Sequence, residues 1–139
     1  MKKLIQNISN QISDDLNSYN RFLLGSLDSK VNLINQILKY VMKLKGKQFR
    51  PILCILSSRL KGEPNDVTFL SATTVEILHV ATLLHDDVVD DSHLRRGWPT
   101  VNYIWKSKLA ILIGDYMFSK SSFQSINADN RFSLCKRIP

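Results

Sequence analysis

The sequence is poor in residues that cross-link a chain or interrupt its helices. Its 139 residues include two cysteines, four prolines and five glycines. Cys54 and Cys135 are far apart and form no Cys-x-x-Cys pair, so we expect two free thiols in a reducing compartment. Tandem repeats, low-complexity tracts and signals of a strand hairpin are also missing, which leaves helices as the expected elements.

Long apolar runs are missing as well. No stretch approaches the 18 consecutive apolar residues that indicate a membrane-spanning helix. Polar residues, among them Gln6 and Asn7, interrupt the apolar character of the N-terminus, which argues against a signal peptide. The sequence therefore predicts a cytoplasmic protein without a transmembrane segment.

The charge balance is basic, but the basic residues form no cluster. The net charge is +7, from 19 lysines and arginines against 12 aspartates and glutamates. Such an excess allows nucleic acid, an anionic membrane surface or phosphorylated substrates as partners. Because the basic residues are scattered rather than collected in a run, we do not expect a nucleic-acid-binding protein. The remaining composition, 44% hydrophobic and 22% charged, is typical of one globular domain.

Apolar residues recur at steps of three and four along most of the chain, which is the period of an amphipathic helix. We predict five or six helices and an all-α fold. The second helix should begin near Ser26 or Asp28, which are suitable N-caps, and end near Gly46. The other helices are expected at about 4–24, 51–60, 67–91 and 101–126.

An acidic cluster closes the predicted helix at 67–91. Four carboxylates lie within six residues and two arginines follow, namely Asp86, Asp87, Asp90 and Asp91, then Arg95 and Arg96. If the helix continues through Asp91, several of the carboxylates are i,i+4 neighbours that repel one another near the negative end of the helix dipole. Such a cluster needs a cation, and carboxylate oxygens without cysteine suit Mg²⁺. Guanidinium groups bind phosphate in a bidentate fork, so the pattern indicates a diphosphate held between metal ions and arginines. The alternative is an acidic helix end paired with basic neighbours on a solvated surface.

These residues carry a family resemblance. The stretch from Asp86 to Gly97 resembles the first aspartate-rich motif of the trans-type polyprenyl diphosphate synthases, above all the bacterial octaprenyl and solanesyl diphosphate synthases. The flanks agree, since His79 to His85 precedes the motif, and Pro99-Thr100-Val101-Asn102 and Gly114-Asp115-Tyr116 follow it. A second stretch, Gly46-Lys47-Gln48-Phe49-Arg50-Pro51, is similar to the family's Gly-Gly-Lys-Arg-x-Arg-Pro loop, with Lys45 in place of the first Gly and Gln48 in place of the first Arg.

The resemblance implies a fold, a cofactor and a set of ligands. It covers residues 1–126 as the N-terminal half of an isoprenoid synthase helical bundle, followed by a divergent tail at 127–139. It implies Mg²⁺ as cofactor, isopentenyl diphosphate and a farnesyl-like allylic diphosphate as substrates, and a homodimer as the assembly. Asp86, Asp87 and Asp90 would bind the metal, and Arg95 would act with them in catalysis and in holding the allylic diphosphate. The expected ligands of isopentenyl diphosphate are Lys47, Arg50, His79 and Arg96.

Two small residues bear on product length. Ala81 and Thr82 lie five and four residues before Asp86, where bulky aromatic residues in the family form a floor that stops chain growth. Because both are small here, we expect an open tunnel and long, octaprenyl-class products of the kind used as ubiquinone side chains. The alternative is that they only allow two helices to pack closely.

A second aspartate-rich motif, which the family carries in its C-terminal half, is not among these 139 residues. We therefore expect a truncated chain that is inactive alone. The alternatives are an inactive gene fragment and a non-catalytic partner subunit of a full-length synthase. A basic nucleic-acid-binding protein is the least favoured hypothesis, because the acidic cluster would repel phosphate unless metal intervened.

Overall fold

The computed structural model describes the backbone of residues 2–44, 46 and 48–135, and the side chains of residues 7–44, 46 and 48–126. The prediction of an all-α fold is confirmed, with two very short strands added. In chain order the described elements are α1 (Lys2–Gln11), α2 (Ser13–Ser26), α3 (Asn32–Lys43), α4 (Phe49–Arg59), α5 (Asp66–Val89), β1 (Leu94–Arg95), β2 (Trp98–Pro99), α6 (Val101–Trp105) and α7 (Ser107–Cys135).

Two of the predicted helices are each divided into two. The helix expected at 4–24 breaks at Ile12, which has φ −113° and ψ 28°. The helix expected at 101–126 breaks at Lys106, which has φ 71° and ψ 154°. Neither position has a glycine or proline to signal the break, and the apolar spacing continues across both. The backbone of α7 also continues as helix into the stretch predicted to be a divergent tail.

The predicted start of the second helix was wrong. Ser26 is the last residue of α2, where its hydroxyl donates to the Phe22 carbonyl at 2.8 Å. The chain then crosses a loop, and α3 begins only at Asn32. The Asn35 amide holds this loop by accepting from the Ser29 N–H at 3.0 Å and donating to the Ser29 carbonyl at 2.6 Å.

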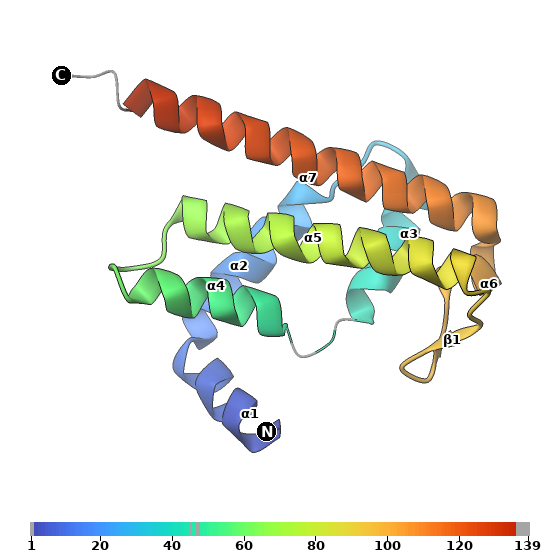
Figure 1. Cartoon of the computed structure of the whole chain (residues 1–139), viewed down its shortest axis with the longest axis horizontal. Helices are drawn as coiled ribbons and strands as arrows, with labels where there is room; N and C mark the ends of the chain where they lie inside the picture. The colour runs from blue at the N-terminus through green and yellow to red at the C-terminus, as the bar shows by residue number, and fades with distance from the viewer. Residues whose placement is uncertain (1, 45, 47, 136–139) are drawn as a thin grey trace.

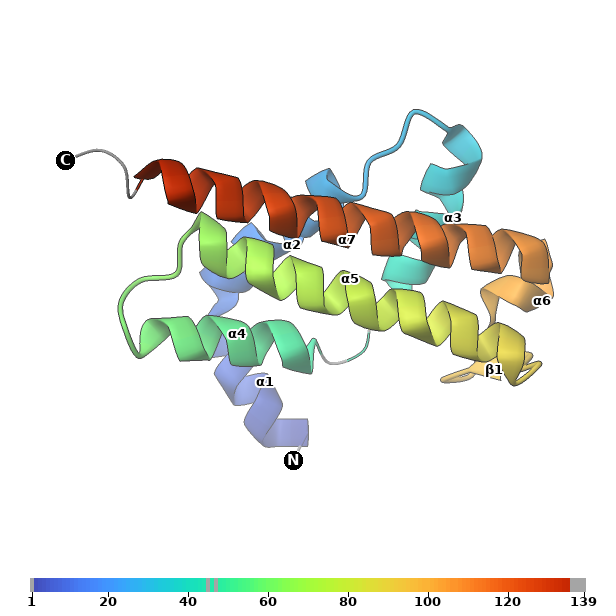
Figure 2. The ribbon, with the colours of Figure 1, turned by 45° about the horizontal axis from the view of Figure 1, so that its top comes forward.

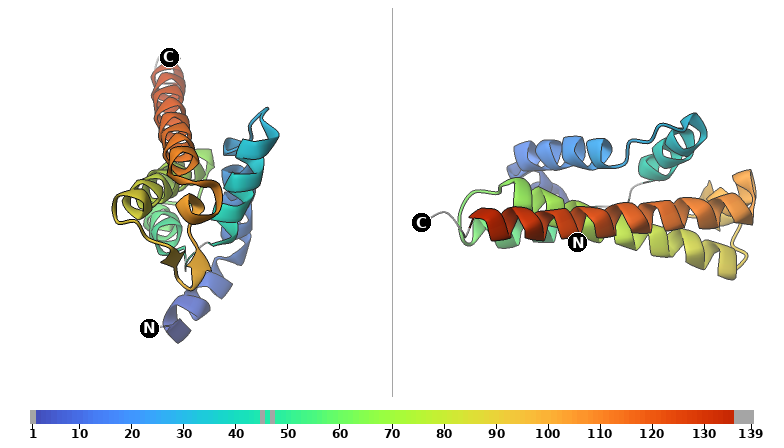
Figure 3. Two further views of the ribbon diagram at one scale, coloured as in Figure 1. Left: turned by 90° about the vertical axis from the view of Figure 1, so that its right-hand side faces the viewer. Right: turned by 90° about the horizontal axis from the view of Figure 1, so that it is seen from above.

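The long helices α5 and α7 lie side by side and antiparallel, with α7 along one edge of the molecule (Figure 1; Figure 2). Helix α4 packs beside the N-terminal part of α5, on the side away from α7, while α2 and α3 lie across one face of these three helices (Figure 1; Figure 3). Asn65 begins α5 with a capping box, in which its side chain accepts from the N–H groups of Val67 and Thr68. Gly114 lets α7 approach α5 closely, because a Cβ at this position would overlap the His85 ring.

A small hairpin, absent from the sequence prediction, follows α5. Strands β1 and β2 are antiparallel, with Arg95 opposite Trp98. The two residues between them, Arg96 and Gly97, have φ angles of 55° and 82°. Positive φ at both central residues is what a tight type I′ hairpin turn requires. Arginine rarely occupies the first of these positions, so the sequence carried no Asn-Gly or Asp-Gly signal for the turn.

A broad apolar face of α7 is exposed. Its large exposed side chains are Ile111, Leu112, Phe118, Phe123 and Ile126.

By length and composition alone α5 could cross a membrane, but it packs against α2, α4 and α7 and buries residues along its whole length, which is typical of a core helix in a soluble protein.

Candidate functional site

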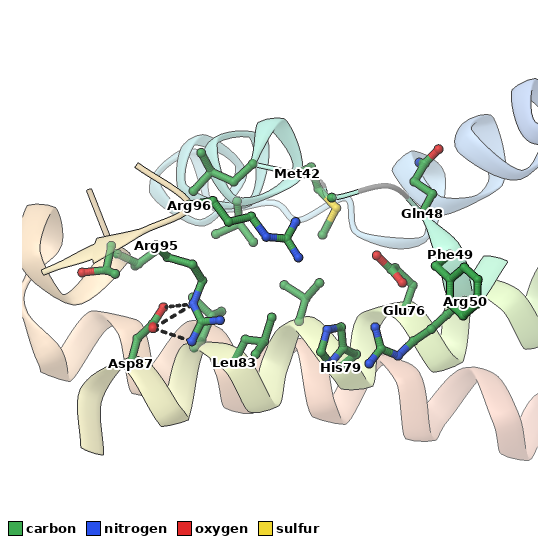
Figure 4. A pocket seen from close by; sticks show the side chains of 17 residues that line it. Met42, Gln48, Phe49, Arg50, Glu76, His79, Leu83, Asp87, Arg95 and Arg96 are labelled. Atoms are coloured by element: carbon green, nitrogen blue, oxygen red, sulfur yellow. Dashed lines mark hydrogen bonds and ion pairs between the residues drawn. The ribbon is translucent and has the colours of Figure 1, made fainter. Parts of the chain in front are cut away.

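A cavity of about 650 Å³ opens between the end of α3, the start of α4, one face of α5 and the hairpin (Figure 4). Four of the predicted site residues with basic side chains line it: Arg50, His79, Arg95 and Arg96. Asp87 lines the same cavity from α5. The structure thus brings together residues from segments that are up to 46 positions apart in the sequence. Lys47 lies outside the described residues.

The helical period of α5 decides which acidic residues face the cavity. His79, Leu83 and Asp87 follow one another at steps of four, and all three line it. Asp86 and Asp90, also one turn apart, lie to one side of this face and are exposed to solvent. Within the described part of the chain neither Asp86 nor Asp90 takes part in an ion pair.

The helix does not continue through Asp91, so the i,i+4 pairing of Asp87 with Asp91 is not formed. Asp90 is the C-cap of α5, and Asp91 has a left-handed backbone with φ 47°. The N–H groups of Asp91 and Ser92 return to the carbonyls of Val88 and Asp87, at 3.3 and 2.9 Å. This is a Schellman motif, which usually places glycine where Asp91 stands. Asp91 therefore leaves the helix, and the chain turns back toward the cavity.

Asp87 forms a bidentate ion pair with Arg95. The Arg95 Nε donates to both carboxylate oxygens, at 2.8 and 3.0 Å, and Nη2 lies 2.7 Å from Oδ1. The Asp87 side chain is buried and the Arg95 side chain is about one-third exposed. Hydrogen bonding to Asp87 raises the pKa of Arg95. Both oxygens of Asp87 are thus engaged by Arg95, whereas Asp86 and Asp90 present theirs to solvent.

Arg96 reaches over the cavity from the hairpin (Figure 4). Its guanidinium lies against Gly46, where a Cβ would overlap it. The backbone at Arg96 is left-handed, so the turn of the hairpin directs the side chain toward the loop between α3 and α4. The two stretches that carry the family resemblance, which begin 40 residues apart at Gly46 and Asp86, therefore meet at this contact.

His79 lies in the most basic part of the cavity, with the Arg50 side chain beside it (Figure 4). Partial burial lowers the pKa of His79, and the positive charges of Arg50, Arg96 and Arg95 lower it further. Burial and the neighbouring arginines thus both favour the neutral imidazole. An anion between these groups would reverse that effect and favour the imidazolium.

Gln48 departs from the family pattern, and the structure reveals its contact. It is the N-cap of α4 with a left-handed φ of 48°, and its amide nitrogen donates to the Asn20 side chain at 2.9 Å. The side chain that replaces an arginine thus connects the start of α4 to α2.

The two residues proposed to set product length lie on different sides of α5. Ala81 is fully buried in the core. Thr82 is exposed, one turn before Asp86 on the same side of the helix, and its hydroxyl donates to the His79 carbonyl at 2.8 Å. Of the two, Thr82 is the one that could contact a chain extending from the acidic end of the helix.

Two residues, one in the cavity and one supporting the hairpin beside it, were missed by the sequence reasoning. Glu76 is buried and lines the cavity one turn before Val80. Tyr40 holds the hairpin from α3, with its hydroxyl 2.7 Å from the Pro99 carbonyl and its ring against Trp105. The helical spacing of Glu76 relative to His79 and Leu83 could have identified Glu76 as a cavity residue. No local pattern could have identified the contact between Tyr40 and Pro99, which are 59 residues apart.

Known proteins resemble this chain over most of its length. The family model for polyprenyl synthetase matches residues 31–137. The all-trans-nonaprenyl-diphosphate synthase (geranyl-diphosphate specific) of Rhodobacter capsulatus is 38% identical over 93% of this chain and 40% of its own length. The octaprenyl diphosphate synthase of Escherichia coli is 35% identical over 84% of this chain and 36% of its own length.

Solved structures agree with the sequence relatives. A decaprenyl diphosphate synthase from Rhodobacter capsulatus is 33% identical, with a TM-score of 0.85 over 94% of this chain and 40% of that one. A polyprenyl synthase from Caulobacter crescentus, complexed with calcium and isoprenyl diphosphate, is 32% identical, with a TM-score of 0.83 over 90% of this chain and 38% of that one. The chain thus spans about 40% of the length of the relatives it matches.

Proposed function

The chain belongs to the polyprenyl synthetase family, and from this premise we propose that it carries the first metal-binding and diphosphate-binding part of a long-chain prenyltransferase. The reaction would join isopentenyl diphosphate to an allylic diphosphate. One observation carries the proposal: the last two turns of α5 present free carboxylates to solvent on one side and face a cavity with four basic side chains on the other.

The residues present fit Mg²⁺. This ion usually binds one or two protein carboxylates and completes its shell with water and substrate phosphates. Asp86 and Asp90 supply such a pair, exposed and one helical turn apart, in a sequence stretch without cysteine. Asp87 was also predicted as a ligand, and its ion pair with Arg95 favours a role in holding that arginine. When bound, the metal would neutralise and polarise the allylic diphosphate.

The side chains of this protein would bind and orient both substrates. Arg95, fixed by Asp87, points a guanidinium at the edge of the acidic cluster, where negative charge grows as the allylic carbon–oxygen bond breaks. Arg50, His79 and Arg96 would hold the diphosphate of isopentenyl diphosphate, and the bound anion would raise the pKa of His79. The alkene then attacks the allylic cation, a proton is lost, and the product is one isoprene unit longer.

We also propose a long product. Thr82 is small and exposed on the side of α5 that carries Asp86, so no bulky side chain at this position closes the path of a growing chain. The nonaprenyl and octaprenyl synthases among the relatives support this proposal, although a geranylgeranyl diphosphate synthase of Saccharolobus solfataricus is also 36% identical. We accordingly propose a product of octaprenyl length, which would serve as a quinone side chain.

A second candidate function is a subunit of a two-chain synthase. The heptaprenyl diphosphate synthase component 2 of Geobacillus stearothermophilus is 33% identical over 79% of this chain. The exposed apolar face of α7 also favours association, whether with a different chain or with a second copy, as in the expected homodimer. Sedimentation of the purified chain would show the association, and a monodisperse monomer would contradict an assembly through this face.

The half-buried free thiol of Cys54 suits the proposed cytoplasmic location.

Calorimetry with the purified chain tests the first proposal. A non-hydrolysable allylic thiodiphosphate should bind with Mg²⁺ and lose at least about tenfold in affinity without it, because the anion is shared with the metal. Asp86→Asn should cause the same loss, whereas Asp66→Asn, an exposed aspartate at the other end of the same helix, should not. Isopentenyl diphosphate should bind more weakly to Arg96→Gln than to Arg21→Gln. Equal binding by Asp86→Asn and the parent chain would refute the metal site.

A further inference from the structure

We propose that Asn102 is a positioning residue, which fixes the hairpin bearing Arg95 and Arg96 to the end of the helix bearing the acidic cluster. This inference rests on the function proposed above. The hydrogen bonds of Asn102 that support it are present in the chain without any ligand. Asn102 ends the Pro-Thr-Val-Asn stretch that follows the two arginines, and its side chain does not line the cavity.

Asn102 connects two segments through one amide group. It is buried, with 8% of its surface exposed, in the first turn of α6. Its Nδ2 donates to the Asp87 carbonyl at 3.2 Å and to the Ser92 carbonyl at 3.1 Å. One acceptor belongs to the last turn of α5 and the other to the first residue after the left-handed turn at Asp91. No other described side chain makes hydrogen bonds to both segments.

Asp87 is therefore held at both of its polar ends. Its carbonyl accepts from the Ser92 N–H and from Asn102, while its carboxylate accepts from Arg95. Carbonyls in the last turn of a helix lack partners within the helix, so these donors satisfy an atom that burial would otherwise leave unpaired. The backbone of Asp87 and its carboxylate cannot shift independently of Arg95.

Thr100 adds to the same clamp. Its hydroxyl donates to the Ser92 carbonyl at 2.6 Å and its N–H donates to the His93 carbonyl at 3.0 Å. Thr100 is 2% exposed and directly precedes α6. The start of the hairpin is thus fixed by two buried side chains before the chain reaches Arg95. Such support matters because a displacement of about 1 Å in a substrate-positioning group can cost about a hundredfold in rate.

A second asparagine provides a matched control. Asn35 also holds a loop through its side-chain amide, with two hydrogen bonds to Ser29 at 3.0 and 2.6 Å. It does not line the cavity that holds the arginines. Asn35→Ala should therefore lower stability by a similar route without affecting Arg95, which separates positioning from general stabilisation.

The first measurement needs no ligand. In the 139-residue chain, the exchange of the Arg95 Nε–H with solvent is followed by NMR, since this proton reports the ion pair with Asp87. Asn102→Ala and Asn102→Asp, which keeps the shape but removes the donors, should each accelerate exchange about tenfold, as expected for the loss of two hydrogen bonds. Asn35→Ala should leave it unchanged. Unchanged exchange in folded Asn102 variants would overturn the inference.

The second measurement connects the clamp to binding. With Mg²⁺, inorganic pyrophosphate should bind the Asn102→Asp chain about tenfold more weakly than the parent and the Asn35→Ala chain. Equal affinity would overturn the positioning role in binding. If the parent binds no pyrophosphate, the proposed function fails, and the exchange of Arg95 alone decides the inference. Should neither Asn102 variant fold, Thr100→Val replaces them, with accelerated exchange in support and unchanged exchange against.

Discussion

The ion pair between Asp87 and Arg95 can be measured directly by a double-mutant cycle. The perturbations are Asp87→Asn, Arg95→Gln and the two together. Each single change leaves one buried or half-buried partner without its counter-charge, whereas the double change removes both charges. The free energy of coupling is the part of the destabilisation that the two single changes share.

Its magnitude follows from the contacts. Three donor–acceptor distances of 2.7 to 3.0 Å make the pair bidentate, and a charge-assisted hydrogen bond contributes about 1.5–3 kcal/mol when it is well shielded. The buried Asp87 carboxylate favours the upper part of this range, while the one-third exposure of Arg95 reduces the value through solvent screening. We expect a coupling of about 1–2 kcal/mol.

The assay is urea unfolding of the four chains followed by circular dichroism, at low and at high salt. The pair between Asp15 and Arg59, with Nη2 to Oδ2 at 2.8 Å and side chains 15% and 40% exposed, serves as the more exposed control. It should show a smaller coupling that salt weakens further. A coupling for Asp87 and Arg95 below about 0.5 kcal/mol, or one no larger than that of the control pair, would refute the reasoning that burial strengthens this contact.

Four further outcomes are expected. Ala81→Phe should destabilise the chain by about 1–3 kcal/mol in urea unfolding because the site is fully buried, and Thr82→Phe should not. In a synthase completed with the C-terminal part of a long-chain relative, Thr82→Phe should shorten the product, and an unchanged product would contradict the floor role. Because the pKa of His79 is lowered in the folded chain, stability should fall as pH drops below about 6.5, and His79→Gln should flatten this slope; a slope that survives would contradict the assignment. The 139-residue chain should show no transfer from farnesyl diphosphate to labelled isopentenyl diphosphate, since a second acidic ligand set is missing from its sequence, and turnover at an ordinary enzymatic rate would show otherwise.

The sequence was sufficient where structure depends on local pattern. The core helix α5 was predicted within two residues at each end, because its apolar period and its acidic end are encoded in neighbouring residues. The same period placed His79 about two turns before Asp86. The chemistry of Arg95 and Arg96 toward phosphate also follows from residue type alone.

The sequence was insufficient where one residue adopts an unusual backbone. Asp91, Arg96 and Lys106 all have positive φ without being glycine, and each changes the direction of the chain. The first two turn the arginines back onto α5 and onto the loop between α3 and α4, so the pairing of Asp87 with Arg95 could not be predicted from spacing. Composition likewise could not show that Ala81 faces the core while Thr82 faces solvent, because that depends on which side of α5 meets α7.

The central claim is that the end of α5 binds a divalent metal together with a diphosphate. Paramagnetic Mn²⁺ in place of Mg²⁺, added with pyrophosphate to the isotopically labelled chain, tests it most directly. We expect loss of backbone amide signals centred on Asp86 and Asp90, spreading to Arg95, and no such loss in the Asp86→Asn, Asp90→Asn double variant. Signal loss centred elsewhere on the chain, or equal loss in the double variant, would show that these carboxylates do not bind the metal.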